Sequence, residues 1–262
     1  MTAAEVYAHI GQCIREIIPN TLWAKALLRI ERTEGAQGYN GVWMTEEGMF
    51  VGLAANSLTE KSIFTPIEEL YQVTTQGGNN EWNLLYFTLM PGGAFEVDFV
   101  LDEDAVTARE YISRTEQMPD AQRREGYRAL QRQLSQARSL QLHISISRRL
   151  PALAAVMQPN WQQLTLHIEQ WGGGFFRFKG VTQADELEEA DEFNVTQDWA
   201  LVKEFYQLCR MPYISSWNLA TWSVKPDGTY SIVFDWNPAH GFNTPRGVAF
   251  PYTHEGRWQE PI

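Results

Sequence analysis

The sequence has few cysteines, no long apolar run and no basic leader segment. Only two of its 262 residues are cysteine, Cys13 and Cys209, and neither lies in a metal-binding or redox motif. We therefore expect two structural thiols in a reducing compartment. No apolar stretch approaches the roughly 20 residues of a membrane-spanning helix, and the N-terminus lacks the regions of a signal peptide. These absences predict a cytoplasmic protein that does not contact a membrane.

The sequence also lacks a recognisable catalytic motif. Its five histidines show no metal-ligand spacing, and neither a nucleophile elbow nor a phosphate-binding loop occurs. A carboxylate cluster at a strand end is the one acid–base candidate, and a solvated strand end is the favoured interpretation of it. Its members are Asp98, Asp102, Glu103 and Asp104. The sequence therefore predicts that the chain is not an enzyme and carries no cofactor or metal.

Positive charge is scarce outside one segment. The net charge is −11, which argues against a general nucleic-acid binder because phosphate neutralisation needs clustered Lys and Arg. Residues 105–150 hold nine Arg against four acidic residues, a net of +5, so the rest of the chain carries −16. An acidic body of this kind favours solubility and can attract a basic protein partner.

The abundant aromatic residues occur in a repeated pattern. A shift of 135 residues aligns Glu69–Val73 with Glu204–Leu208, Trp82–Leu84 with Trp217–Leu219, Pro91–Phe95 with Pro226–Tyr230, and Phe99 with Phe234. A shift of 138 to 140 adds Pro19–Trp23 with Pro159–Trp161, and Leu28–Glu31 with Leu166–Glu169. Because the matched pieces keep the same order, they indicate a tandem duplication.

Each repeat has the periodicities of an α+β module. Helical spacing predicts helices over residues 4–18, 64–75 and 197–210, with Pro66 near the start of the second. Strands are expected over residues 23–30, 82–89, 95–101, 161–168, 219–224 and 230–236. Hairpins are expected around Glu46 and at Gly172–Gly174, which Phe175–Phe178 follows. A short strand is also expected near Val248–Pro251. Alternation along 230–236 indicates that one face of that strand is the more buried.

Two turns and a connector complete the expected organisation. Pro91-Gly92-Gly93 and Pro226-Asp227-Gly228 are typical of tight turns, because Pro fixes φ and Gly adopts positive φ. We expect two similar modules, each an antiparallel sheet packed with helices. The first copy spans residues 1–104, an Arg-rich helical connector spans 105–142, and a diverged second copy with a C-terminal extension spans 143–262. In the connector, Arg124, Arg128 and Arg132 are predicted to share one helical face.

The second copy also holds the densest block of negative charge. Six acidic residues occur within residues 185–192. A hydrated loop, a surface that attracts a basic partner and a calcium site are the three interpretations, and the last lacks the ligand order of a calcium-binding loop. Several tryptophans suggest a stacking surface, although core packing explains most of them. The predicted partner-binding residues are Asp185, Glu186, Glu188, Glu189, Asp191, Glu192, Trp222 and Trp236.

The opening and closing patterns of the repeat resemble the YezG-like immunity protein family. The opening consists of Tyr7–Ile10, Ile17–Pro19 and Trp23–Leu28, and the closing pattern consists of Trp82, a glycine turn and Phe95–Phe99. The resemblance covers about residues 3–104 and, more weakly, about residues 145–238. This family usually has a single module, so the tandem arrangement departs from its pattern.

The resemblance implies an antitoxin that neutralises a cognate polymorphic toxin domain by non-catalytic occlusion. The toxin C-terminal domain would be the partner, and a nuclease domain would be basic because it must hold phosphate. The alternative is a ligand- or nucleic-acid-binding module that uses the Arg-rich connector, and the overall negative charge makes nucleic acid the less favoured partner. An enzyme with a carboxylate site near residues 98–104 ranks last.

Overall fold

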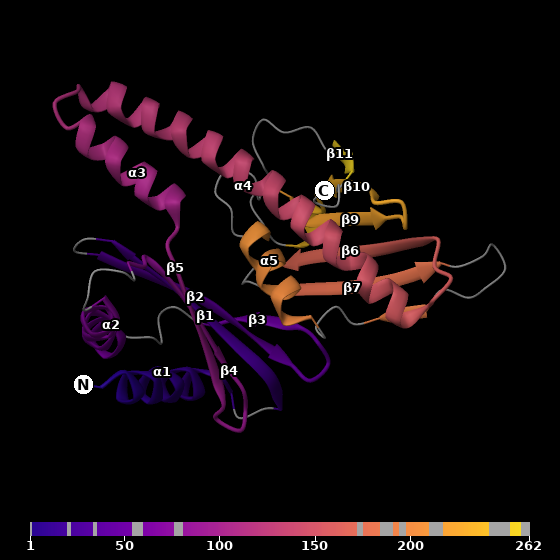
Figure 1. Ribbon diagram of the computed structural model, residues 1–262, viewed down its shortest axis with the longest axis horizontal. Helices are drawn as coiled ribbons and strands as arrows, with labels where there is room; N and C mark the ends of the chain where they lie inside the picture. Colours follow the sequence, from indigo (N-terminus) through magenta and orange to yellow (C-terminus); the bar gives the residue numbers. More distant parts are fainter. Residues whose placement is uncertain are drawn as a thin grey trace. The chain divides into compact units, whose positions relative to one another are not determined.

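The protein folds into two α+β modules, as the computed structural model shows (Figure 1). The structure describes residues 2–19, 22–33, 36–53, 60–75, 81–171, 175–183, 191–193, 198–209, 217–240 and 252–257. One compact unit comprises Met1–Arg109 with Gly173–Phe175, and the other comprises Glu110–Gly172 with Phe176–Ile262. We call these units the first and second modules and describe each by itself.

The first module is an antiparallel sheet with two helices on one face. Its elements are α1 (Ala3–Ile17), β1 (Trp23–Thr33), β2 (Ala36–Thr45), β3 (Phe50–Gly52), α2 (Glu60–Thr75), β4 (Leu84–Leu89) and β5 (Phe95–Val100). The strand order is β3-β2-β1-β4-β5. Ile10 of α1 and Leu70 of α2 belong to one buried cluster with Leu28, Leu85 and Phe87 of the sheet. Both helices therefore cover the same face.

Local sequence explains where α1 begins and which side it buries. The Thr2 hydroxyl accepts a hydrogen bond from the Glu5 backbone N–H, and the Glu5 carboxylate accepts one from the Thr2 N–H. This reciprocal pair satisfies two backbone donors at the N-terminus of the helix. Val6, Ile10 and Ile14 recur every four residues and are fully buried. The expected helix over residues 4–18 is thus confirmed with slightly shifted ends.

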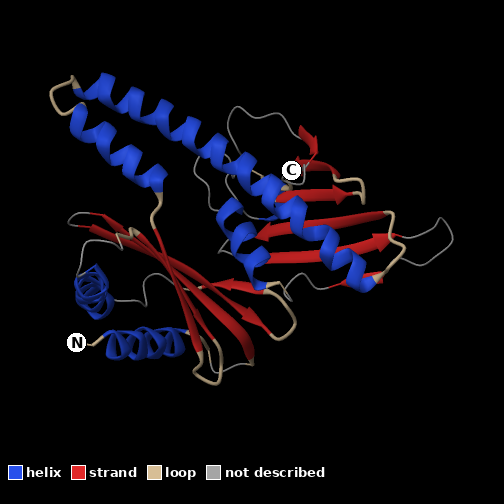
Figure 2. Ribbon diagram, in the orientation of Figure 1, coloured by secondary structure: helices blue, strands red, loops and turns tan. Residues whose placement is uncertain are grey.

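The second module repeats the same element order (Figure 2). After α3 (Glu103–Arg114) come α4 (Asp120–Met157), β6 (Gln163–Trp171), β7 (Phe175–Gln183), β8 (Asp191–Phe193), α5 (Trp199–Cys209), β9 (Leu219–Val224), β10 (Thr229–Asp235), the 3-10 helix Pro238–His240 and β11 (Tyr252–Arg257). The strand order is β8-β7-β6-β9-β10-β11. The two modules therefore share one helix and strand order, and β11 is an addition in the second.

The strand register of the two modules matches the spacing of the sequence repeat. Leu28 on β1 lies opposite Phe87 on β4, and Leu166 on β6 lies opposite Trp222 on β9. The repeat offsets of 138 and 135 residues relate these two pairs. Both tight turns also have the expected geometry, with φ of 91° at Gly93 and 83° at Gly228. The expectation of two similar α+β modules is confirmed.

A buried asparagine fixes the same point in each module. The Asn83 side-chain amide donates to the Asp102 carbonyl at 2.9 Å and accepts from its N–H at 2.6 Å. Asn218 makes the equivalent pair with Asn237 at 2.7 and 2.6 Å. Each asparagine therefore ties the residue before an inner strand, β4 or β9, to the chain just after the neighbouring strand.

We expect Asn218→Ala to lower the free energy of unfolding by about 2–3 kcal/mol, because two backbone groups lose their partner at a fully buried site. The matched control is Asn237→Ala, which keeps the backbone N–H and C=O that Asn218 contacts. Urea denaturation followed by circular dichroism measures both variants. Equal losses in the two variants would contradict the role assigned to Asn218.

The connector and the first helix of the second module are one continuous helix. The expected boundary at residue 142 lies inside α4, which runs from Asp120 to Met157. No glycine or proline occurs between Gly126 and Pro151 to end it. The half after residue 140 buries Leu142, Ile146 and Leu150, whereas most side chains before it are exposed. α4 therefore combines the expected connector with a core helix.

Other expected elements differ from the structure. The strand predicted over residues 23–30 extends to Thr33, and β2 begins at Ala36, well before the expected hairpin. Helix α2 begins at Glu60, so Pro66 lies inside the helix and not at its start. The expected turn at residues 172–174 and the strand at residues 248–251 lie outside the described residues.

Candidate protein-binding surface

The sheet of the second module has one face covered by helices and one face without them. On the covered face, the Trp222 Nε1–H donates to the Ser147 hydroxyl of α4 at 2.9 Å. The Trp222 ring centroid lies 5.6 Å from that of Phe205 of α5. Both helices therefore pack on the side to which Trp222 points, and side chains alternate between the two faces along each strand. Figure 1 shows α4 and α5 together over this sheet.

The opposite face is polar and accessible to solvent. We call it the polar face, and its side chains are all half-exposed or exposed. It comprises Thr165, His167, Glu169, Leu219, Thr221, Ser223, Ser231, Val233, Asp235, Thr253 and Glu255. The hydroxyl groups of Thr165, Ser223 and Ser231 lie in one cross-strand row that Glu255 extends. The face therefore offers hydrogen-bonding groups and carboxylates on a fixed β-sheet.

The first module has different side chains at the equivalent positions. The repeat relates Thr165 to Leu27, Thr221 to Tyr86 and Ser223 to Thr88. Leu27, Tyr86 and Thr88 are buried, whereas their counterparts in the second module are partly exposed. The two modules thus share the core under their helices and have diverged on the other face.

Trp222 is corrected from a partner-binding residue to a core residue. Its side chain is 0% exposed, and its ring lies edge-on to those of His143 and Phe205. A partner could not reach it without unfolding the module. Trp236, which directly follows β10, is half-buried, and its N–H donates to the Asp235 carboxylate at 2.7 Å. Trp236 therefore stays a prediction at the edge of the polar face.

The acidic block lies only in part within the described residues. Asp185, Glu186, Glu188 and Glu189 fall outside them. The backbone of Asp191 and Glu192 belongs to β8, where Asp191 pairs with Thr182 and Glu192 with Val181 of β7. The end of the block is therefore a strand, and its role in binding stays a prediction.

A histidine lies buried between α4 and the second sheet. His143 accepts from or donates to the Ser139 hydroxyl at 3.1 Å, and its ring centroid is 4.9 Å from that of His254 on β11. Burial, with a smaller contribution from the nearby His254, lowers the pKa of His143 to about 3. His143 is therefore neutral at physiological pH, and the sequence patterns gave no indication of this position.

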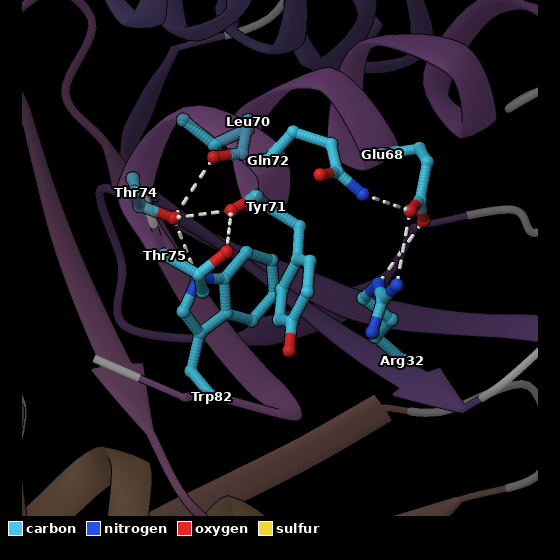
Figure 3. Close-up of polar contacts among 8 residues, drawn as sticks. All are labelled: Arg32, Glu68, Leu70, Tyr71, Gln72, Thr74, Thr75 and Trp82. Carbon is cyan, nitrogen blue, oxygen red and sulfur yellow. Dashed lines mark hydrogen bonds and ion pairs between the residues drawn. The ribbon is translucent and has the colours of Figure 1, made fainter. Parts of the chain in front are cut away.

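An ion pair that the sequence analysis missed joins β1 to α2 (Figure 3). The Arg32 guanidinium donates two hydrogen bonds to Glu68 at 3.0 and 3.1 Å and lies 3.5 Å from the Tyr71 ring centroid. These hydrogen bonds are the main reason that the pKa of the Glu68 carboxyl is lowered. The repeat places Gln170 and Lys203 at the matching positions. The cluster is therefore a structural feature of the first module alone.

The other two candidate regions also have defined places. The Asp102 carboxylate accepts the N–H groups of Asp104 and Ala105 at 3.1 and 3.4 Å, which satisfies the first turn of α3. Arg124, Arg128 and Arg132 are exposed and lie four residues apart on α4. The carboxylate cluster therefore has a capping role, whereas the arginines form an accessible basic stripe.

Comparisons with known proteins give no family for this chain. No protein-family model matches it, and no curated protein sequence matches it. Within the described residues, no three His, Cys, Asp or Glu side chains are grouped so as to hold a metal ion. None of the described helices is both long and apolar enough to cross a membrane.

Proposed function

We propose that this protein is a cytoplasmic immunity protein that binds a toxin domain and blocks it without catalysis. The observation that carries the proposal is the polar face of the second module. Two modules with the same core differ there, because Leu27, Tyr86 and Thr88 are replaced by smaller, partly exposed hydroxyl residues. Side chains that need not pack against helices are free to diverge towards a partner. The resemblance to YezG-like immunity proteins supports the same function.

Charge favours a basic partner for this face. Glu169, Asp235 and Glu255 contribute three carboxylates to it, and the whole chain carries a net charge of −11. A toxin domain that holds nucleic acid presents clustered Lys and Arg. Complementary potentials raise the association rate, and salt screens them. The proposed complex is therefore expected to form faster and more tightly at low ionic strength.

The test uses a toxin C-terminal domain encoded next to this protein. We expect the two to co-purify as a stable complex at low salt and toxin activity to be lost in it. Glu169→Lys with Glu255→Lys is expected to weaken binding at least tenfold by calorimetry. The matched control is Glu116→Lys, which changes one exposed charge in the α3–α4 turn. A complex that tolerates the double reversal would move the interface elsewhere, and failure to co-purify would overturn the proposed function.

The exposed arginine stripe of α4 supports one second candidate, an anion- or nucleic-acid-binding module. Arg124, Arg128 and Arg132 lie about 6 Å apart along the helix axis. This function predicts retention of nucleic acid during purification and a steep loss of affinity with salt. A protein that purifies without nucleic acid and does not shift labelled RNA or DNA at 50 mM salt would exclude it.

A further inference from the structure

The first module ends in an open strand edge where the second module has one more strand. In the second module, β11 pairs antiparallel with β10 along its whole length. The equivalent strand of the first module is β5, which pairs with β4 and lies last in the sheet order. Among the described residues, none pairs with its outer edge. Because an unpaired edge presents a row of backbone donors and acceptors, it is a template for another strand.

Backbone geometry defines which groups of β5 face outward. The Met90 N–H donates to the Ala94 carbonyl at the base of the turn, and hydrogen-bonded pairs then alternate along an antiparallel ladder. Glu96 is therefore bonded to β4, whereas the N–H and C=O groups of Phe95, Val97 and Phe99 point away from it. Lys225 and Thr229 make the same turn contact in the second module, so Tyr230, Ile232 and Phe234 point towards β11.

The side chains of β5 divide into an apolar and an acidic row. Phe95 and Phe99 lie on the helix-covered side, where Phe95 stacks on Phe87 at 5.3 Å and Phe99 lies 5.1 Å from Trp82. They nevertheless stay 42% and 38% exposed, which is unusual for rings packed on a core. Glu96 and Asp98 lie on the opposite side and are exposed. A further strand would cover the aromatic rings and place its alternate side chains beside the carboxylates.

We propose that β5 binds an extended, antiparallel segment of a protein partner in which apolar residues alternate with lysine or arginine. The β10–β11 register sets the positions: residues opposite Ser231 and Val233 in the second module are Glu255 and Thr253. By the repeat, the partner residues at these two places lie opposite Glu96 and Asp98 and are basic. Opposite charges directly across a strand pair stabilise it.

The same charges exclude a second copy of this chain as the occupant. Antiparallel pairing of two β5 strands about Val97 keeps the apolar rows on one side. It also places Glu96 of one chain opposite Asp98 of the other, twice in each pair. Like charges directly opposite each other destabilise a sheet, and charged residues are a common protection of edge strands against self-association. The edge is therefore selective for a basic strand.

This inference deepens the proposed function, because a basic toxin domain would supply such a strand, but its test does not need the toxin. The probe is a labelled peptide with the sequence of residues 252–257, changed to lysine at positions 253 and 255 and to valine at position 254. The comparison peptide carries glutamate at positions 253 and 255. Fluorescence anisotropy measures binding, and amide hydrogen exchange locates it.

We expect the lysine peptide to bind at least tenfold more tightly than the glutamate peptide and to protect the amides of Phe95, Val97 and Phe99. The variant with Glu96→Lys and Asp98→Lys is expected to reverse this preference. Val97→Pro removes an outward N–H without breaking the β4 ladder, so it is expected to lose binding of both peptides. The far-ultraviolet circular dichroism of each variant checks that it is folded.

Two results would overturn the proposal. One is equal binding of both peptides to the folded wild-type protein. The other is protection that maps away from residues 95–99. If the peptide binds as expected but the toxin domain does not co-purify, the edge site stands and the immunity function fails. If the toxin domain binds and the peptide does not, the immunity function stands and the partner uses another surface.

Discussion

Replacing Trp222 by alanine is expected to lower the free energy of unfolding of the second module by about 3–5 kcal/mol. The indole is fully buried between the sheet, α4 and α5, so its loss leaves a cavity that the surrounding side chains fill only in part. The Ser147 hydroxyl, also buried, loses its hydrogen-bond donor. The midpoint of urea denaturation measures the loss, and hydrogen exchange shows which amides it reaches.

Phe87→Ala is the matched control for this substitution. Phe87 occupies the equivalent register position opposite Leu28 in the first module and is also fully buried. We expect it to increase amide exchange mainly in the first module, whereas Trp222→Ala does so mainly in the second. A loss below about 1 kcal/mol for Trp222→Ala would contradict the assignment of this residue to the core.

Acidification is expected to destabilise the second module between about pH 6.5 and pH 3. The pKa of His143 is about 3 in the folded protein and about 6.5 in an unfolded chain. Across this window the unfolded state binds a proton that the folded state does not, so stability falls as the pH falls. At about 1.4 kcal/mol for each pH unit, the full effect is up to roughly 5 kcal/mol.

Comparison with His143→Gln isolates this effect from that of carboxylates, which also protonate in acid. The variant is expected to show a shallower fall in the free energy of unfolding between pH 6.5 and pH 4, measured by urea denaturation at each pH. His167→Gln, which changes an exposed histidine of the polar face, controls for the loss of an imidazole. Parallel pH curves for wild type and His143→Gln would show that His143 does not govern the acid response.

The elements that were predictable from the sequence are those that local chemistry determines. Pro91 and Gly93 fix a turn because proline sets one φ angle and glycine accepts the positive φ of 91°. Helix α1 follows from its cap at Thr2 and its apolar spacing. The long β2 strand was not predictable, because Gly41 belongs to it for a non-local reason. A Cβ at Gly41 would lie 2.5 Å from the Leu27 carbonyl oxygen on the neighbouring strand.

The same limit explains the error at the candidate site. Trp222 and Trp236 have similar apolar neighbours in the sequence, and only strand pairing distinguishes them. Trp222 lies opposite Ile232 and Leu166, which places it on the face that the helices cover. The polar face itself consists of Thr, Ser, His and acidic residues at alternate positions of several strands, so no continuous motif marks it. The Arg32–Glu68 pair joins residues 36 positions apart and leaves no local pattern.

The continuity of α4 has a consequence for synthesis on the ribosome. The helix is complete at Met157, but β9, which carries Trp222, begins only at Leu219. At about 5–20 residues per second, the ribosome needs roughly 3–12 s to add these intervening residues. During this interval Leu142, Ile146 and Leu150 lack the sheet that later buries them. The nascent second half of the chain therefore presents an apolar helix to chaperones, while all strands of the first module have already been synthesised.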